Sequence, residues 1–156
     1  MNLTKTPQFQ NFNIEGINHI SPKDAFAAIN DGSAVIIDVR ELSETYSQCI
    51  PHNHVFYHPM SVILDRLIHI PTDKLIIVAC THGERSVKVA NLFTIKGMEN
   101  VANLDGGLDA WLAEGLPIEK IEQSESGCGC GCGCSTPEPE PEQPSGCGCD
   151  CSGGCC

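Results

Sequence analysis

The chain has 156 residues, with 9 Lys and Arg against 20 Asp and Glu, for a formal net charge of −11. This length suits one domain of about 100–150 residues plus an appendage. The acidic balance argues against a sequence-independent grip on nucleic acid or anionic lipid, and no apolar run approaches the roughly 18–20 residues that cross a membrane. Because the first residues also lack an apolar secretory core, we expect a soluble, cytoplasmic protein that binds neither nucleic acid nor membrane.

Cysteine divides the chain into two parts. Nine of the 11 Cys lie between Cys128 and Cys156, whereas the first 120 residues hold only Cys49 and Cys80. After Glu122 there is no aliphatic or aromatic residue, so this part cannot bury enough apolar surface to offset chain entropy. We therefore expect an N-terminal extension at 1–13, a globular domain at 14–120 and a disordered, low-complexity Cys/Gly/Pro/Glu tail at 121–156.

The globular part alternates strand and helix signals. Ser21 and Pro22 begin a helix that continues to Asn30, because Ser is a preferred N-cap and Pro is favoured in the first turn. Apolar runs predict strands at 34–39, 75–79 and 101–104, and apolar periodicity with glycine stops predicts helices at 86–96 and 108–113. This alternation predicts an α/β fold with an open parallel sheet flanked by helices.

The chemistry is expected in the loop Cys80-Thr-His-Gly-Glu-Arg-Ser86, between a predicted strand and a predicted helix. In an open α/β sheet, ligands bind beyond the carboxyl ends of the strands, and a loop that enters a helix directs backbone N–H groups inward. The helix dipole and Arg85 would favour the thiolate of Cys80, which is the nucleophilic form. The alternative is a buried cysteine that acts only as a small hydrophobic residue.

At this point the sequence resembles the rhodanese family of sulfurtransferases in its single-domain form, over roughly residues 14–120. Four segments carry the resemblance in the family's order and spacing: Val35-Ile-Ile-Asp-Val-Arg-Glu41, Ile50-Pro51, Cys80-x-x-Gly83-x-Arg85-Ser86, and Asp105-Gly-Gly-x-x-x-Trp111. The resemblance implies an enzyme that moves sulfane sulfur from thiosulfate or a persulfide donor, through a persulfide on Cys80, to a thiol or cyanide acceptor. It implies no cofactor for this transfer.

The resemblance also assigns roles by position. Cys80 matches the nucleophile and persulfide carrier, and Arg85 matches the anion-binding arginine. The substrate-binding loop comprises Thr81, His82, Gly83, Glu84 and Ser86. Asp38 and Arg40 match an Asp-x-Arg pair that supports the edge of the active site.

Two departures affect these expectations. His52-Asn53 follows Ile50-Pro51 where many relatives have Gly-Ala, which leaves the shape of that loop open. Glu84 places a carboxylate in the loop and should repel a dianion such as thiosulfate, so a persulfide donor would suit the site better.

A phosphatase branch shares the fold, and loop length separates the two activities. Four residues lie between Cys80 and Arg85, whereas the phosphatase-like relatives have one more. Because the smaller ring fits one sulfur atom and the larger ring fits a tetrahedral phosphate, sulfur transfer is favoured over phosphatase or arsenate reductase activity.

Other residues each have two interpretations. His52, His54 and His58 could hold a metal but are more typical of loop and edge-strand residues; His82 could touch substrate or face solvent. Cys49 could act as a resolving thiol, although core packing is favoured, and Trp111 is expected to anchor the core.

The tail cysteines also have several interpretations. Closely spaced thiols can bind a soft ion such as Zn²⁺ or Cu⁺, can accept sulfur from Cys80, or can be inert. A rhodanese-like docking module with a metal-binding tail is the alternative to the enzyme. The candidate ligands are Cys128, Cys130, Cys132, Cys134, Cys147, Cys149, Cys151, Cys155 and Cys156.

Overall fold

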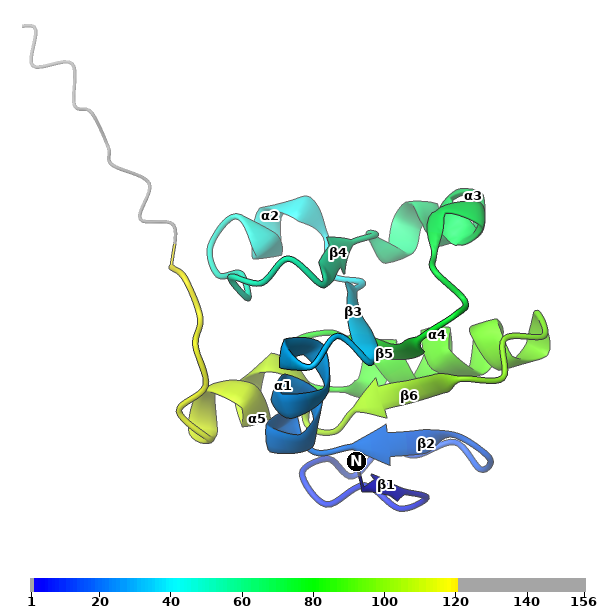
Figure 1. Cartoon of the computed structure of the whole chain (residues 1–156), viewed down its shortest axis with the longest axis horizontal. Coiled ribbons are helices and arrows are strands. Elements are labelled where there is room, and N and C mark those ends of the chain that lie inside the picture. Colours follow the sequence, from blue (N-terminus) through cyan, green and yellow to red (C-terminus); the bar gives the residue numbers. More distant parts are fainter. Residues whose placement is uncertain (1, 121–156) are drawn as a thin grey trace, which may run out of the picture. The chain divides into compact units, whose positions relative to one another are not determined.

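A computed structural model describes residues 2–120 as six strands in one sheet with helices on both faces (Figure 1). The strands are β1 (Leu3–Thr4), β2 (Asn18–Ile20), β3 (Ala34–Asp38), β4 (Val55–Tyr57), β5 (Leu75–Ala79) and β6 (Val101–Leu104). The main helices are α1 (Pro22–Asn30), α2 (Leu42–Thr45), α3 (Ile63–Arg66), α4 (Glu84–Ile95) and α5 (Gly107–Ala113). Two short 3₁₀ turns, η1 (Met60–Val62) and η2 (Leu67–His69), flank α3.

The sheet has the strand order β1-β2-β6-β5-β3-β4. The five strands β2, β6, β5, β3 and β4 are each parallel to their neighbours, which confirms the predicted parallel arrangement. The sheet as a whole is mixed, because β1 adds an antiparallel edge strand beside β2. This two-residue strand has no apolar alternation and was not predicted.

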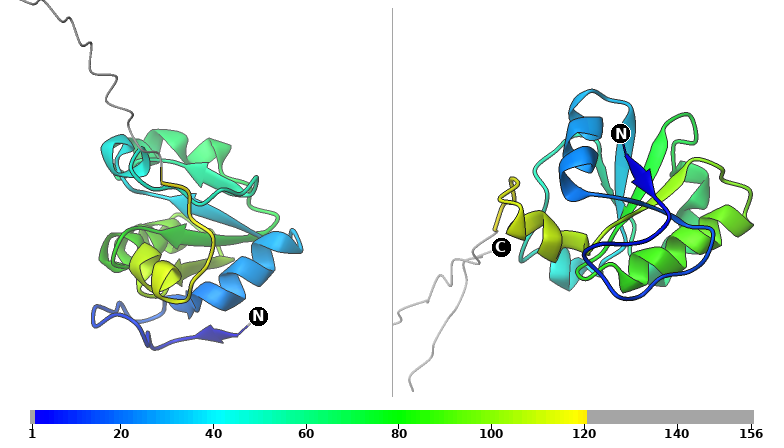
Figure 2. Two further views of the ribbon diagram at one scale, coloured as in Figure 1. Left: turned by 90° about the vertical axis from the view of Figure 1, so that its left-hand side faces the viewer. Right: turned by 90° about the horizontal axis from the view of Figure 1, so that it is seen from below.

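The buried side chains of the central strands alternate between the two faces of the sheet. Ile36, Ile77 and Ala79 pack on one face with α1 and α5, while Val35 and Val78 pack on the other with α4. The two views in Figure 2 show α1 and α4 on opposite sides of the sheet. The expected α/β architecture with helices on both faces is confirmed.

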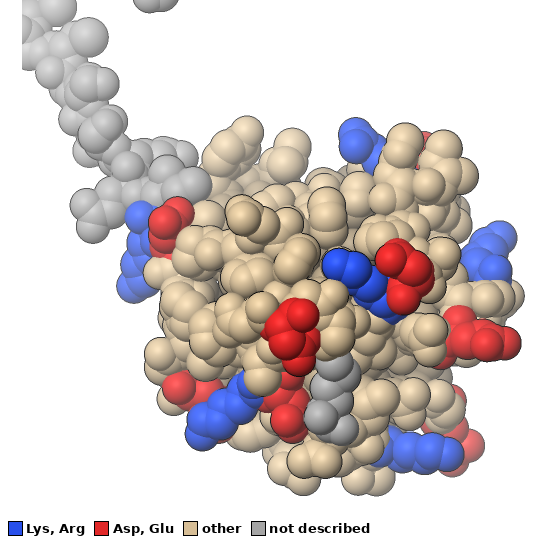
Figure 3. Space-filling view, viewed as in Figure 1, with Lys and Arg blue, Asp and Glu red and all other residues tan. Residues whose placement is uncertain are grey.

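On the face drawn in Figure 3, Lys and Arg side chains are scattered among acidic ones, and no continuous basic area forms there. Within residues 2–120, no helix has both the length and the apolar character needed to cross a membrane.

Candidate active site

The loop after β5 encloses the sulfur of Cys80. The backbone N–H groups of Gly83 and Ser86 point at Cys80 Sγ, at 3.1 and 3.4 Å. Cys80 is only 1% exposed. The sulfur therefore lies against the N-terminus of the twelve-residue helix α4, where backbone donors and the helix dipole favour a negative charge.

The hydroxyl of Ser86 adds a third polar contact to this sulfur. Ser86 Oγ lies 3.2 Å from Cys80 Sγ and donates to the carbonyl oxygen of Gly83 at 2.9 Å. A hydroxyl has one proton, so in this arrangement its oxygen is free to accept the S–H of the thiol. When the sulfur is a thiolate, the same hydroxyl has to turn and donate to it.

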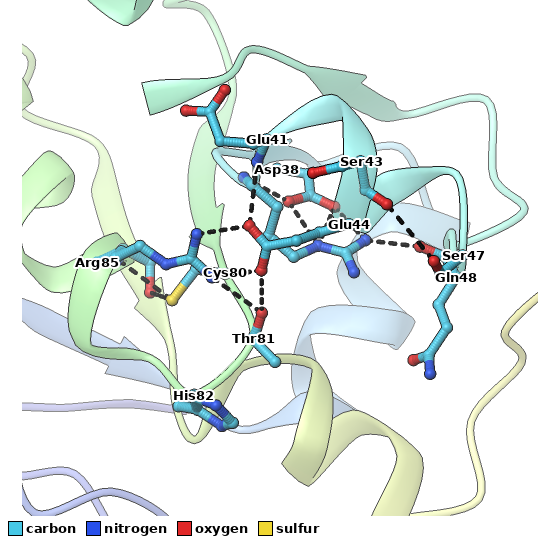
Figure 4. Close-up of polar contacts among 12 residues, drawn as sticks. Asp38, Glu41, Ser43, Glu44, Ser47, Gln48, Cys80, Thr81, His82 and Arg85 are labelled. Carbon is cyan, nitrogen blue, oxygen red and sulfur yellow. Dashed lines mark hydrogen bonds and ion pairs between the residues drawn. The ribbon is translucent and has the colours of Figure 1, made fainter. Parts of the chain in front are cut away.

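The guanidinium of Arg85 is paired with the carboxylate of Glu44. Its Nη1 and Nη2 atoms donate to the two carboxylate oxygens of Glu44 at 2.7 and 2.6 Å, as drawn in Figure 4. Thr81 Oγ1 donates to Glu44 Oε1 and accepts from Arg85 Nη2, both at 3.0 Å. Glu44, on the short helix α2, therefore closes a triangle of polar contacts with Thr81 and Arg85 of the loop after β5.

This pairing fixes the charge of both groups. The hydrogen bonds from Arg85 lower the pKa of Glu44 to about 2. The same contacts raise the pKa of Arg85 above its already high ordinary value. Both side chains are therefore charged throughout the neutral range.

Asp38 and Arg40 form a second charged pair at the carboxyl end of β3. Arg40 Nη2 donates to Asp38 Oδ2 at 2.7 Å and to the carbonyl oxygen of Gln48 at 2.8 Å. The side chains of Arg40 and Asp38 are 4% and 0% exposed. The pair ties β3 to the segment after α2, and its supporting role at the active site stays a prediction.

Helix α5 holds the loop through its first N–H groups. Leu108 N donates to the carbonyl oxygen of Cys80 at 2.9 Å, and Asp109 N donates to that of Thr81 at 3.1 Å. A Cβ atom on Gly107 would lie 2.4 Å from the Cys80 oxygen. Only glycine permits this close approach, which gives the Asp105-Gly-Gly motif a physical reason.

A shallow cleft of about 290 Å³ borders the loop. Its lining combines charged and polar side chains with one leucine: Arg40, Glu44, Ser47, Gln48, Thr81, Asp109 and Leu112. His82 is exposed at the rim, where its Nδ1 is hydrogen-bonded to Asp109 Oδ2. Glu84 is exposed and has no ion pair with another described residue.

Sequence reasoning missed Glu44, Gln10 and Asp109. Glu44 is 41 residues from Arg85, so local spacing does not connect them. Gln10 lies in the segment expected to be an extension, yet its Oε1 accepts from Asn103 Nδ2 and from Gly106 N, both at 3.1 Å. The acidic start of the last predicted helix was the one available signal for Asp109.

The remaining candidates are placed as follows. Residues 2–120 contain no cluster of three His, Cys, Asp or Glu side chains arranged to hold a metal ion. Cys49 is half-buried, not in the core as favoured from the sequence, and its backbone forms an isolated bridge with that of Glu119. Trp111 is fully buried and donates to the carbonyl oxygen of Pro117, which confirms it as a core anchor. The tail cysteines from Cys128 to Cys156 lie outside the described residues.

Comparisons with known proteins agree with this geometry. Residues 21–114 match the family model of the rhodanese-like domain. A thiosulfate sulfurtransferase GlpE of Glaesserella parasuis is 30% identical over 107 residues, which cover 67% of this chain and 95% of that protein. A sulfurtransferase of Allochromatium vinosum is 31% identical over 103 residues, covering 65% and 94%. A rhodanese-related crystal structure from Thermoplasma volcanium has a TM-score of 0.59 at 27% identity, covering 67% of this chain and 98% of that one.

Proposed function

Because this chain belongs to the rhodanese-like family, we propose that it is a sulfurtransferase that carries sulfane sulfur as a persulfide on Cys80. The donor is thiosulfate or a persulfide, and the acceptor is a thiol or cyanide. The observation that supports the proposal most directly is the convergence of two backbone N–H groups on Cys80 Sγ at the start of α4.

The first step loads the enzyme. The Cys80 thiolate attacks the outer sulfur of the donor, a Cys80–sulfur bond forms, and the donor's own bond to that sulfur breaks. Sulfite leaves when the donor is thiosulfate, and a thiolate leaves when it is a persulfide. The N–H groups of Gly83 and Ser86 are placed to stabilise the anionic sulfur before and after transfer.

The second step transfers the sulfur from the enzyme to the acceptor. The acceptor attacks the outer sulfur of the Cys80 persulfide and takes that atom, and Cys80 leaves as a thiolate that can accept the next sulfur. No oxidant, metal or other cofactor is needed, because the sulfur and the electron pairs balance in each step. Thr81 and Asp109 line the cleft beside the loop, and the exposed His82 is paired with Asp109, so we expect an acceptor to approach from this side.

A mass shift on Cys80 tests the proposal. The reduced protein is treated with thiosulfate or with an alkyl persulfide, alkylated, and digested for mass spectrometry. The Cys80 peptide should gain the mass of one sulfur, and cyanide should then release that sulfur as thiocyanate. Cys80→Ser should lose both results, while Cys49→Ser, which changes the other free cysteine of residues 2–120, should retain them. Thiocyanate formation at the wild-type rate by Cys80→Ser would reject the proposal.

We also propose that the protein acts in the cytoplasm without nucleic acid or membrane partners, and that the tail binds Zn²⁺ or Cu⁺. Support for the metal comes from nine thiols between Cys128 and Cys156, since thiolates are the ligands these soft ions prefer. Native mass spectrometry of the reduced chain should detect bound metal. A chain that binds metal but never loads Cys80 would instead favour a docking module with a metal-binding tail.

A further inference from the structure

The two guanidinium groups at the loop around Cys80, those of Arg85 and Arg40, are each paired with a carboxylate. Arg85 is held by both carboxylate oxygens of Glu44, and Arg40 is held by Asp38. At the rim, His82 meets Asp109. Each guanidinium near Cys80 therefore already has a carboxylate partner within hydrogen-bond distance.

The Glu44–Arg85 pair stays charged at neutral pH. The low pKa of Glu44 keeps its carboxylate ionised far below pH 7. The contact with Arg85 is bidentate, which is the strongest geometry for a guanidinium and a carboxylate. An incoming anion must either displace Glu44 from Arg85 or bind beside its negative charge.

The pairing of Arg85 with Glu44 should weaken the binding of thiosulfate more than the binding of an alkyl persulfide. Thiosulfate is a dianion whose oxygens need cationic or N–H partners, and its loading step releases a second dianion, sulfite. An alkyl persulfide carries at most one negative charge on the reacting sulfurs. The N–H groups of Gly83 and Ser86 can satisfy that charge without Arg85.

We infer that Glu44 determines the sulfur donor, by occupying Arg85 so that the site accepts an alkyl persulfide in preference to thiosulfate. This inference rests on the proposed sulfur transfer through Cys80. In the favoured reaction, the Cys80 thiolate attacks the outer sulfur of the hydropersulfide R–S–SH. The products are the Cys80 hydropersulfide and the thiolate R–S⁻, so that atoms, charge and the single proton balance.

The test compares two donors on one enzyme. The rate of Cys80 persulfide formation is measured by rapid quench and mass spectrometry, at low concentrations of thiosulfate or of 2-hydroxyethyl persulfide. The variant Glu44→Gln keeps the shape of the side chain and removes its charge. Glu99→Gln removes the same charge from an exposed position after α4, at the end of that helix away from Cys80, and serves as the matched control.

The wild type should load from the persulfide faster than from thiosulfate. Glu44→Gln should raise the thiosulfate rate about three- to fivefold, the size of a partly exposed charge interaction, and should change the persulfide rate less than twofold. Glu99→Gln should change neither rate. An unchanged ratio of the two rates in Glu44→Gln, with its melting temperature retained, would overturn the inference.

A measurement on the wild type covers the case in which Glu44→Gln does not fold. If Arg85 were available to thiosulfate, added salt would screen it and slow loading from this dianion. With Arg85 neutralised by Glu44, loading from thiosulfate should change little or rise between low and high ionic strength. A steep fall would reject the inference. Failure of the proposed function looks different, because Cys80 would then load from neither donor.

Discussion

The side-chain oxygen of Gln10 fills the space beside Gly83 where any larger residue would place its Cβ atom. That Cβ would lie 1.7 Å from Gln10 Oε1. Gly83 has a φ of 91°, in the left-handed region that favours glycine. Gln10, which precedes the first helix, thus contacts the loop around Cys80 and restricts which residue can follow His82.

Gly83→Ala should destabilise the protein and impair loading of Cys80. The left-handed backbone alone costs a residue with a Cβ about 1–2 kcal/mol, and the contact with Gln10 adds to this. Gly97 has a nearly equal φ of 88° with nothing within 4 Å of its would-be Cβ, so Gly97→Ala is the matched control. Urea unfolding should show a larger loss for Gly83→Ala. Equal losses in the two variants would mean that Gln10 moves aside without cost.

Ser86→Ala should slow the reaction of Cys80 with iodoacetamide at neutral pH. The hydroxyl is 3.2 Å from the sulfur and can donate to its thiolate. Removing a hydrogen bond to a charged group costs about 1.5–3 kcal/mol, so a rate loss of about tenfold or more is expected. Ser43→Ala, at an exposed position on α2, should leave the rate unchanged. Alkylation followed by mass spectrometry measures both variants.

The unfolding free energy should fall as the pH drops from about 7 to 5. Burial lowers the pKa of His19 and of His58 below 6.5, and the positive charges of Arg66 and His69 add to the effect at His58. Near pH 6.5 these histidines bind protons in the unfolded chain but not in the folded chain. Lowering the pH therefore favours the unfolded state, and stability present above pH 6.5 is lost below it. Urea titrations at several pH values measure the slope.

Two variants test whether the buried histidines cause this pH dependence of stability. His58→Gln should reduce the pH dependence, because it removes one of the buried rings. His19→Gln should reduce it too, because His19 is the other buried ring whose pKa is lowered by burial. A flat stability profile between pH 7 and 5 in the wild type would show that the two buried rings accept protons without cost.

Truncation after Lys120 should leave the melting temperature within about 2 °C in the absence of metal, because the described core is built from earlier residues. Cyanide-dependent release of sulfur should survive as well. Native mass spectrometry should show that Zn²⁺ or Cu⁺ binding is lost. A large fall in melting temperature would mean that the tail contributes to folding.

The sequence predicted those parts of the fold that depend on local pattern. The apolar runs of β3, β5 and β6 and the Ser21-Pro22 start of α1 lie at their expected positions, because each is specified by adjacent residues. The pairing of Glu44 with Arg85 is different, since it depends on the packing of α2 against the loop. Glu84 is adjacent to Arg85 in the sequence, yet it is exposed.

The contacts of the N-terminal residues could likewise not be predicted from the local sequence. Gln8 and Phe9 donate their N–H groups to the carboxylate of Asp105, and Gln10 contacts Gly106. None of these contacts depends on hydrophobic periodicity, which is the main signal that sequence reasoning can use. Polar contacts of the backbone with a distant loop leave no trace in local composition.

The hydrogen bonds from Leu108 and Asp109 to the carbonyl oxygens of Cys80 and Thr81 anchor the start of the loop around Cys80. Farther along the loop, Gly83 has no free space beside Gln10. We therefore expect that enlarging the loop to hold a phosphate requires changes in the N-terminal segment as well as in the loop. A single insertion after His82 should yield a less stable protein with no phosphatase activity on p-nitrophenyl phosphate.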